Sequence, residues 1–443
     1  MFQALANSFK IAELRSRILL TLGLIAVYRL GCYIPTPGIN GQALAEFFDK
    51  MARTQGGALF AVMDLFSGAA LSQCTIFALG IMPAISASII MQLLTVVLPS
   101  LEKLAKEGGE AGRRQINQYA RYLTVGLGVL QALFIALWLE NPAHFDGMAI
   151  VQTPGWGFRL TTVVTLASGT AFIMWLGEQI TQFGIGNGMS ILITAGIISR
   201  VPTALHQLWQ MITLRQTPPA MLALMVVMLV GVVVAIIAIT QGQRRIPVQY
   251  ARRVVGRKMY GGQMTYIPIR VNHAGVMPII FAQSILLFPA TMAGFFPHRA
   301  LQAASQWLMS GAVHAVLYAA GIIFFAYFYT AISFNPVEVA DNMRKYGGFV
   351  PGIRPGQSTA EFFDHVLTHI TLPGAVFLAV IAILPDWVGR GLKIPYSVAS
   401  FFGGTGLLII VGVMLDTMRQ VESFLLMRHY EGFLRHSRVR GRR

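Results

Sequence analysis

Charged side chains are scarce in this chain. Of its 443 residues, 12% are Asp, Glu, Lys or Arg, about half of the roughly 25% found in soluble domains, while 55% are hydrophobic. Soluble domains adding up to this length would need far more charge to cover their surface. The shortage argues against a soluble enzyme and indicates an integral membrane protein.

Acidic residues are the scarcer of the two charged types. The chain has 18 Asp and Glu against 34 Lys and Arg, which gives a formal net charge of +16. A surplus of this size needs anionic lipid, nucleic acid or an acidic protein surface nearby. The sequence therefore predicts contact with at least one of these three.

Motifs for catalysis, nucleotide binding and metal binding are absent from the sequence. There is no GxxxxGK[ST], HExxH or GxSxG, and the two cysteines, Cys32 and Cys74, form no CxxC and have no His at ligand spacing. We therefore expect no catalytic residue, no cofactor, no metal site and no disulfide framework. An energy-consuming activity would have to draw on a partner.

Ionisable residues are almost missing from the centres of the apolar runs. Such a side chain costs about 2.5 to 3.5 kcal/mol at the bilayer centre and is kept only for function. Arg29 is the exception, and snorkelling toward the outer interface would explain it. A proton- or sodium-coupled transporter usually needs a midplane carboxylate or a broken-helix ion site, so this absence counts against one.

Ten stretches are long and apolar enough to cross a bilayer. A hydrocarbon core about 30 Å thick takes about 20 mostly apolar residues in a helix. The predicted spans are residues 18–36, 75–97, 119–139, 159–177, 184–201, 219–241, 272–296, 310–334, 371–389 and 398–418. The sequence therefore predicts an all-α integral membrane protein with ten transmembrane helices.

The distribution of Lys and Arg predicts the orientation. With both termini inside, the cytoplasmic segments hold 25 of the 34 Lys and Arg residues. Short cytoplasmic loops carry an excess of these residues. We therefore expect both termini, and the large loops 242–271 and 335–370, to lie in the cytoplasm.

The even number of spans allows two halves of five, residues 1–208 and 209–443. Because five is odd, the second half enters from the opposite face, so an inverted repeat is the natural architecture. One apolar piece, residues 59–71, is too short to cross. It is either a half-depth re-entrant helix or an amphipathic helix on the outer surface, and composition does not separate the two.

Apolar residues recur at helical spacing inside two spans. Ile81 and Ile85 are four residues apart, as are Met189 and Ile193, so each pair lies on one stripe of its helix. Such stripes usually pack a core. If they faced a central axis instead, they would form a constriction that blocks ions by dewetting.

Two cytoplasmic loops carry unusual patterns. Residues 242–271 alternate β-branched and aromatic residues with arginines, which predicts a projecting strand or hairpin with a basic face. RNA phosphates or an acidic protein would suit that face, although topology and anionic lipid alone could also account for the charge. In the second loop, Pro351 and Pro355 stiffen the backbone around Arg354.

Six strings carry a resemblance to a known family. They are FSGAALS at 66–72, FALGIMPAISASII at 77–90, WLGEQITQFGIGNG at 175–188, RRIPVQYARR at 244–253, FNP at 334–336 and FVPGIRPG at 349–356. Together they resemble the SecY family of bacterial protein-translocation channel subunits along essentially the whole chain. The resemblance implies two pseudo-symmetric halves of five helices around a central pore.

The resemblance also assigns roles to particular residues. The implied pore ring is Ile81, Ile85, Met189, Ile193, Ile280 and Ile409. The implied plug, which would close the outer funnel, is Phe66, Ser67, Gly68, Ala69, Ala70 and Leu71. The implied lateral gate lies between the second and third spans on one side and the seventh and eighth on the other, and includes Ser86, Gln92 and Phe288.

The resemblance further implies partners and an activity. The activity is passage of unfolded secretory proteins across the plasma membrane and lateral release of transmembrane segments into lipid. Expected partners are SecE and SecG, the motor ATPase SecA, the ribosome with its RNA and proteins, signal sequences with their nascent chains, and anionic lipids. The implied docking residues are Arg244, Arg245, Arg252, Arg253, Arg257 and Arg354.

The sequence departs from the family pattern in two places. Relatives usually carry Ile where Met189 stands, and paired glycines where Gly68 and Ala69 stand. A secondary transporter of a small solute would share the span count and the loop charge, but it predicts a midplane polar site that the sequence lacks. A lipid-handling or structural scaffold would explain the apolar composition, but not the two large basic loops.

Overall fold

The computed structural model describes residues 11–52, 63–64, 66–142, 145, 148, 150–214, 218–250, 253–255, 258–260, 264–295, 299–308, 311–392 and 404–436. Most of these residues are helical. The helices up to residue 213 are α2 (Ala12–Gly31), α3 (Gly41–Ala52), α5 (Met82–Val97), α6 (Pro99–Glu107), α7 (Gly109–Leu139), α8 (Trp156–Phe183), α9 (Gly188–Ile198) and α10 (Val201–Thr213).

The second part of the chain adds further long helices and a small sheet. Its helices are α11 (Pro219–Gln241), α12 (Met277–Phe295), α13 (Arg299–Leu308), α14 (Gly311–Ser333), α15 (Pro336–Lys345), α16 (Gln357–Leu392) and α18 (Thr405–His436). Its strands are β1 (Gln243–Tyr250), β2 (Arg253–Val255), β3 (Lys258–Tyr260), β4 (Met264–Arg270) and β5 (Gly348–Phe349).

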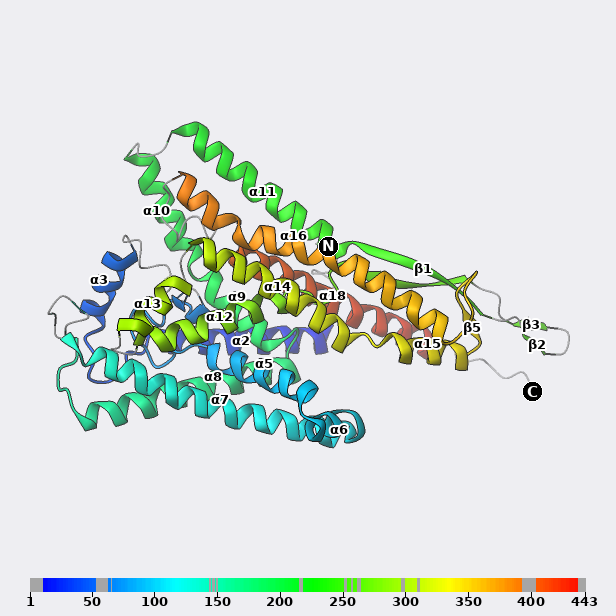
Figure 1. The fold of residues 1–443 in the computed structure, drawn as a ribbon, viewed down its shortest axis with the longest axis horizontal. Helices are drawn as coiled ribbons and strands as arrows, with labels where there is room; N and C mark the ends of the chain where they lie inside the picture. Colours follow the sequence, from blue (N-terminus) through cyan, green and yellow to red (C-terminus); the bar gives the residue numbers. More distant parts are fainter. Residues whose placement is uncertain are drawn as a thin grey trace.

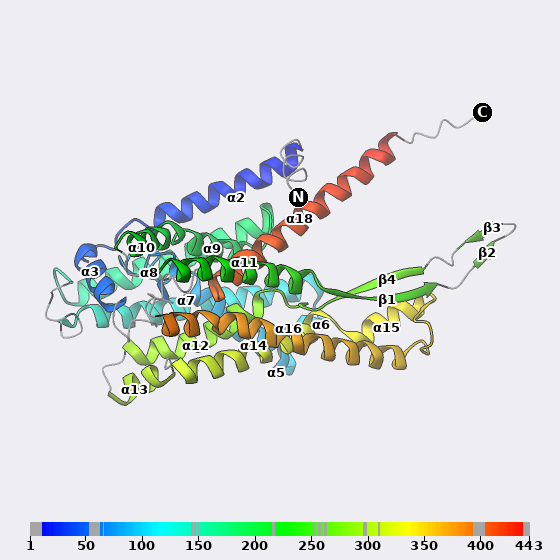
Figure 2. The same cartoon turned by 90° about the horizontal axis from the view of Figure 1, so that it is seen from above.

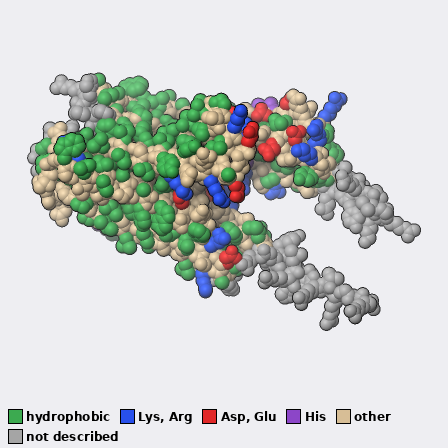
Figure 3. Space-filling model, turned by 90° about the horizontal axis from the view of Figure 1, so that it is seen from below, with side chains coloured by type: hydrophobic (Ala, Val, Ile, Leu, Met, Phe, Trp, Pro, Cys, Tyr) green, Lys and Arg blue, Asp and Glu red, His purple; other side chains and the backbone are tan. Residues whose placement is uncertain are grey.

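The long helices lie side by side along the long axis of the molecule (Figures 1 and 2). The hairpin of β1 and β4 projects beyond the bundle at one end, next to α15, whereas α3 and α13 lie at the opposite end. Hydrophobic side chains cover much of the bundle, and most charged side chains visible from below gather toward the hairpin end (Figure 3). Large apolar side chains such as Val227, Val316 and Phe324 are exposed, as expected of a surface in contact with lipid.

Each of the ten predicted spans contains a helix. Within the part of the chain that the structure describes, six helices are long and apolar enough to cross a membrane, or seven if the bent pair α5 and α6 forms one span. Residues Met277–Ala293 of α12 form a further, shorter apolar helix. A membrane protein with several spanning helices is confirmed, while the count of ten stays a prediction.

The bend between α5 and α6 has a local cause. The two helices meet at 96°. Leu98 between them is extended, with φ −95° and ψ 114°, because the ring of Pro99 disfavours a helical conformation in the residue before it. The chain therefore turns sharply where the apolar run ends.

The helices pack as two groups that meet along two seams. In the first group α8 packs against α7, α9 and α2, and α5 packs against α7; in the second, α14 packs between α12 and α16. Across the groups, α12 contacts α5 and α7, and α18 contacts α9. The largest apolar cluster draws buried residues from both groups, so the main core of the bundle lies where the groups meet.

The predicted hairpin in residues 242–271 is confirmed. Strands β1 and β4 pair antiparallel from Gln243 opposite Arg270 to Gln249 opposite Met264. Strand β5, from the second large loop, joins the other edge of β1, so the two loops form one three-stranded sheet. One face of the hairpin packs on α15 and α16 through a separate apolar cluster that includes Ile246, Val248 and Phe363.

Candidate functional site

The six residues of the predicted pore ring lie in one apolar cluster. They come from four helices of both groups: Ile81 and Ile85 at the start of α5, Met189 and Ile193 in α9, Ile280 in α12 and Ile409 in α18. The five isoleucines are buried members of the largest cluster, and Met189 packs against it. The fold therefore brings together side chains that the sequence spreads over most of its length.

Met189 differs from the five isoleucines. It is only partly buried, and its sulfur lies against α8, where a Cβ added to Gly177 would be 2.7 Å from the thioether. Gly177 therefore provides the room that this longer side chain occupies. A flexible thioether fills such irregular space readily, which accounts for Met at this position.

The start of α9 is fixed from three sides. The Asn187 side chain caps the helix by accepting a hydrogen bond from the Ser190 N–H at 3.2 Å. In the preceding loop, the Ile185 N–H donates to Thr21 Oγ1 of α2 at 3.2 Å. The Gly186 N–H donates to Gln420 Oε1 of α18 at 2.7 Å. These bonds position Met189 and Ile193 between the two groups.

The predicted lateral-gate residues lie on two packed helices. Ser86 and Gln92 belong to α5 and Phe288 belongs to α12, and these helices are in contact. Ser86 is buried, whereas Gln92 is partly exposed and donates a hydrogen bond to Ser88 Oγ at 3.4 Å. The structure therefore places all three residues on α5 and α12, which meet along one of the two seams.

The predicted plug, residues 66–71, lies inside the bundle. Phe66, Ser67, Ala70 and Leu71 are each at most 5% exposed. Residues 63–64 and 66–67 are helical and are followed by turns. Burial of this kind favours the half-depth alternative over a helix on the outer surface. We call residues 66–71 the plug segment.

Backbone conformation bends the plug segment sharply. Gly68 and Ala69 have φ angles of +67° and +76°, in the left-handed region. Glycine adopts this region without strain, whereas in alanine it is strained. Ala69 thus stands where the family pattern has its second glycine, and it keeps the left-handed conformation that favours glycine.

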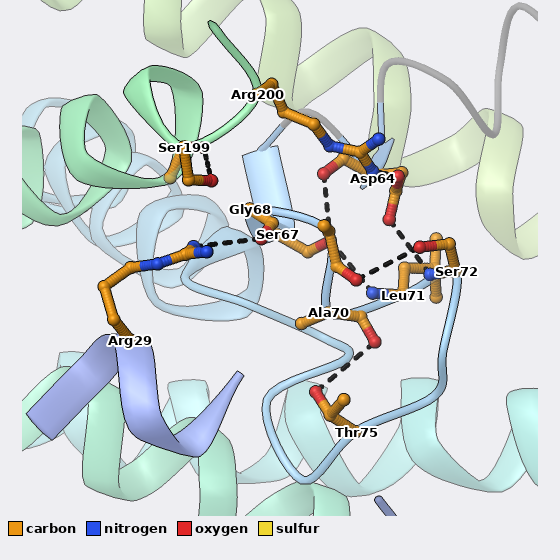
Figure 4. A network of polar contacts seen from close by, with 12 residues as sticks. Arg29, Asp64, Ser67, Gly68, Ala70, Leu71, Ser72, Thr75, Ser199 and Arg200 are labelled. Carbon is orange, nitrogen blue, oxygen red and sulfur yellow. Dashed lines mark hydrogen bonds and ion pairs between the residues drawn. The ribbon is translucent and has the colours of Figure 1, made fainter. Parts of the chain in front are cut away.

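Asp64 organises the plug segment from its N-terminal side (Figure 4). Its Oδ1 accepts a hydrogen bond from the Ser72 N–H at 2.9 Å, and its carbonyl oxygen accepts from the Ala69 N–H at 3.0 Å. Its carboxylate also forms an ion pair with Arg200, at the junction of α9 and α10. One aspartate therefore ties both ends of the segment together and links them to α9.

Helix α2 holds the other side of the plug segment. The Tyr28 hydroxyl donates to the Ser67 carbonyl at 3.4 Å, and Arg29 Nη1 donates to the Gly68 carbonyl at 3.0 Å. The guanidinium of Arg29, for which snorkelling was the expected explanation, thus also binds a backbone carbonyl of the plug segment. It also lies over the Tyr33 ring, 5.6 Å from the centroid.

The structure describes the side chains of three of the six predicted docking arginines. Arg244 and Arg245 are exposed on β1, and Arg354 is exposed in the turn before α16. Arg252 and Arg257 lie outside the described residues, as does the side chain of Arg253 in β2. Because β5 joins β1 to the loop that carries Arg354, the sheet brings the two predicted docking loops together.

The base of the hairpin is tied to the bundle. Arg419 Nη2 of α18 donates to the Thr240 carbonyl at 2.8 Å, just before β1 begins. The Val271 N–H, just after β4, donates to the Gly242 carbonyl at 2.9 Å. Since Gln420 binds the loop before α9, adjacent residues of α18 contact both the hairpin base and the start of the pore-ring helix.

Sequence reasoning missed Tyr28, Asp64 and Arg200. An arginine directly between two apolar runs was a usable clue for Arg200, as an arginine inside a run was for Arg29. Asp64, the one charged residue of the apolar piece 59–71, offered a similar clue, but its ion pair with Arg200 joins residues 136 positions apart and could not be read from the sequence. Among the described residues, no group of three or more His, Cys, Asp or Glu could hold a metal ion.

Comparisons with known proteins identify the family of this chain. Residues 75–418 match the SecY family. The chain is 43% identical to the protein translocase subunit SecY of Aquifex aeolicus, over 98% of this chain and 100% of the relative. It is 46% identical to the corresponding subunit of Escherichia coli K12, over 97% of this chain and 96% of the relative.

Solved structures share the fold at low sequence identity. One described as the structure of a protein conducting channel aligns with a TM-score of 0.64 and 15% identity, over 96% of this chain and 95% of that one. Sec61 in the canine ribosome-channel complex aligns with a TM-score of 0.61 and 14% identity, over the same shares. The bundle thus has the fold of protein-conducting membrane channels. The chain belongs to the SecY family.

Proposed function

We propose that this chain is the channel-forming subunit of a Sec translocase in the bacterial plasma membrane. It passes unfolded secretory proteins across the membrane and releases transmembrane segments sideways into lipid. The observation that carries this proposal is the convergence of five buried isoleucines and Met189, from both helix groups, on one apolar cluster. The plug segment supports it, because it is buried beside α9 and hydrogen-bonded to α2.

An apolar ring suits a conduit for polypeptides of any sequence. A narrow apolar constriction excludes ions by dewetting when no chain fills it. When a chain passes, flexible apolar contacts discriminate little among its side chains. The ring residues therefore form a seal that opens around an extended polypeptide, and the plug segment closes the outer side.

The seam between α5 and α12 is the proposed lateral gate. Helices α5 and α7 form one side, and α12 with α14 behind it forms the other. A hydrophobic signal sequence or membrane span leaves through this seam because lipid is its better solvent, by about 0.8 kcal/mol per buried CH₂. Ser86, Gln92 and Phe288 line the exit.

The proposed topology has ten spans in two inverted halves, residues 1–208 and 209–443. The packing of the helices in two groups supports that division. The stronger contacts between the groups are those of α12 with α5 and α7 and of α18 with α9. Both termini lie in the cytoplasm, on the side of the β1–β4 hairpin. The concentration of charge toward the hairpin end supports this orientation (Figure 3).

Energy and partners come from outside the chain. The channel is passive, and SecA, an elongating ribosome or the membrane potential drives transport. SecE and SecG complete the membrane complex, and anionic lipids surround it. The fold neighbours include Sec61 in a ribosome-channel complex and yeast Ssh1 bound to the 80S ribosome, which supports ribosome docking on the arginines of the hairpin and on Arg354.

The experiment that tests this function is site-specific photo-crosslinking to a secretory chain stalled halfway across the membrane. A photoreactive residue at Ile193 or Ile280 should crosslink to the stalled chain. The matched control is Val227, which is exposed on the outer face of α11 and should crosslink to lipid instead. Crosslinks from Val227 but from neither isoleucine would contradict the channel and return these residues to core packing.

A secondary transporter is the alternative, and the family relationship does not favour it. The stalled-chain experiment separates the two functions directly, because a solute transporter has no path for a polypeptide.

A further inference from the structure

The ion pair between Asp64 and Arg200 joins the plug segment to α9, the helix that carries Met189 and Ile193 of the ring. Asp64 is 10% exposed and Arg200 is 31% exposed at their side chains. Arg200 follows Ser199, the C-cap residue of α9, and stands at the N-cap position of α10. It lies seven residues after Ile193, a distance of about 10 Å along a helix at 1.5 Å per residue.

Next to this ion pair, the backbone of the plug segment at Gly68 lies close to the backbone of α9. A Cβ added to Gly68 would lie 2.9 Å from the Cα of Gly196, and Gly196 stands one helical turn before Arg200. No side chain separates the two backbones at this point. A shift of α9 would therefore act on the plug segment at once, without side chains to absorb it.

Asp64 links the ion pair to the rest of the plug segment. The same carboxylate accepts the Ser72 N–H, and the Asp64 carbonyl accepts from Ser67 Oγ at 3.2 Å and from the Ala69 N–H. Releasing the carboxylate from Arg200 would free the segment on the α9 side. On the other side, the two donors from α2, Tyr28 and Arg29, would still hold it.

We infer that Asp64 and Arg200 form a latch that sets how hydrophobic a signal sequence must be to open this channel. This inference rests on the proposed function. A signal that parts α5 from α12 widens the ring, moves α9 and separates Arg200 from Asp64. Because Arg200 is partly exposed, water can solvate its guanidinium when the pair separates, and the Ser72 N–H still faces the Asp64 carboxylate, so the latch can open and close repeatedly. Arg200 is thus a positioning residue for the plug segment.

The test measures the demand for signal hydrophobicity in the complete translocase reconstituted in vesicles. The variants are Arg200→Gln, Asp64→Asn, the double variant and Arg200→Lys. Asn retains one oxygen that can accept the Ser72 N–H, so Asp64→Asn removes the charge and the oxygen that faces Arg200 while that hydrogen bond can remain. Each single neutral variant should raise translocation of a precursor with a weakened signal severalfold, relative to the same precursor with its intact signal.

Two readouts separate a latch from a merely structural contact. The double neutral variant should be no more permissive than either single variant, because the same interaction is already broken in each of them. Arg200→Lys should restore most of the discrimination. The matched control is Arg159→Gln, which breaks the ion pair with Glu140 away from the plug segment and should leave discrimination unchanged.

The outcomes distinguish the latch from the function beneath it. If the wild-type complex moves the intact precursor but Arg200→Gln keeps full discrimination, the latch is wrong and the channel stands. Additive effects in the double variant also overturn the latch. If the wild-type complex moves no precursor, the proposed function is overturned and the latch falls with it.

Discussion

At Gly68 the plug segment comes close to another backbone, that of Gly196 in α9. Its φ of +67° lies in the left-handed region, and a Cβ there would also lie 3.0 Å from Arg29 Nη1. Glycine meets both requirements, conformational and steric. The position is therefore sensitive to the addition of a single methyl group.

Replacing Gly68 by alanine should loosen the plug segment. The left-handed backbone costs an alanine about 1–2 kcal/mol, and the contact with Gly196 adds strain. We expect a lower Tm of the purified complex and a higher resting ion conductance in planar bilayers. The control is Gly23→Ala in α2, where nothing lies within 4 Å of the added Cβ. Equal behaviour of the two variants would contradict the close approach.

Glu140 is held ionised at the end of α7 opposite the hairpin. It accepts a hydrogen bond from Arg159 Nε at 2.7 Å and one from the Gly155 N–H at 2.9 Å. Burial raises the pKa of this carboxyl, but the Arg159 and Gly155 hydrogen bonds together outweigh it and lower the pKa below its ordinary value. The charged form therefore stabilises the folded state.

The sign of this pKa shift predicts a dependence on pH. Because the folded pKa is lowered, the stabilisation is present at neutral pH and disappears as the pH falls through the lowered pKa. Glu140→Gln should therefore reduce the Tm of the complex at pH 7, and the difference from wild type should shrink as the solution is acidified. The control is Glu110→Gln, in the exposed pair with Arg114. A difference that is constant with pH would refute the ionic origin.

The β1–β4 hairpin has two different faces, and this division sets its role. Ile246 and Val248 of β1 are buried against α15 and α16, whereas Arg244, Arg245 and Pro247 are exposed. Strand alternation places Arg245 and Pro247 on the face opposite Ile246 and Val248, whereas Arg244 lies on the same face as Ile246 but is exposed. Packing holds the hairpin in place, and the exposed arginines are available to a partner.

Reversing the charge of the two exposed arginines should weaken ribosome binding without unfolding the hairpin. Removing one Arg–phosphate interaction reduces the slope of log K against log salt by about one, so Arg244→Glu with Arg245→Glu should reduce it by about two. Ribosome binding to the reconstituted complex, titrated with salt, measures this slope. Lys50→Glu in α3, at the opposite end of the bundle (Figure 1), is the control. An unchanged slope would assign these arginines to topology or lipid.

The start of α5 shows a limit of prediction from the sequence. The apolar run at 75–97 predicts a helix throughout, but α5 begins only at Met82. Thr75 instead pairs with Pro35, Gly80 takes a φ of +58°, and the Ile76 carbonyl lies where a Cβ on Gly169 would be. These contacts come from distant segments, so apolar periodicity alone could not reveal them.

The residues of the predicted pore ring lie at the junction of the two helix groups. Helix α12 contacts α5 and α7, and α18 contacts α9, so the ring residues stand where both seams meet. A relative movement of the groups would widen the ring and part the lateral gate at the same time. The proposed seal and the proposed lateral gate would therefore be features of one interface.

Polar substitution in the ring should break the seal. Ile193→Asn or Ile280→Asn would wet the constriction, which should raise resting ion conductance in planar bilayers and relax the demand for a strongly hydrophobic signal. The control is Val227→Asn, which faces outward on α11 and should leave conductance unchanged. Unchanged conductance for both isoleucine variants would count against the pore.

The sequence by itself determined the class of protein, the approximate position of each helix, the projecting hairpin and the strings that mark the family. These features depend on composition and on neighbours within a few residues, so a linear reading suffices. Ile280 and Ile409 could be named for the ring only through resemblance, because nothing local distinguishes them from core isoleucines.

Only the tertiary structure decided the contacts of Arg29, Asp64 and Arg200. Their partners lie 39 and 136 positions away along the chain, and a hydrogen bond or ion pair forms only where the fold closes such a gap. Arg29 illustrates the difference. On an isolated helix its guanidinium could reach polar groups only at the membrane interface, whereas in the folded bundle it donates to the Gly68 carbonyl at 3.0 Å.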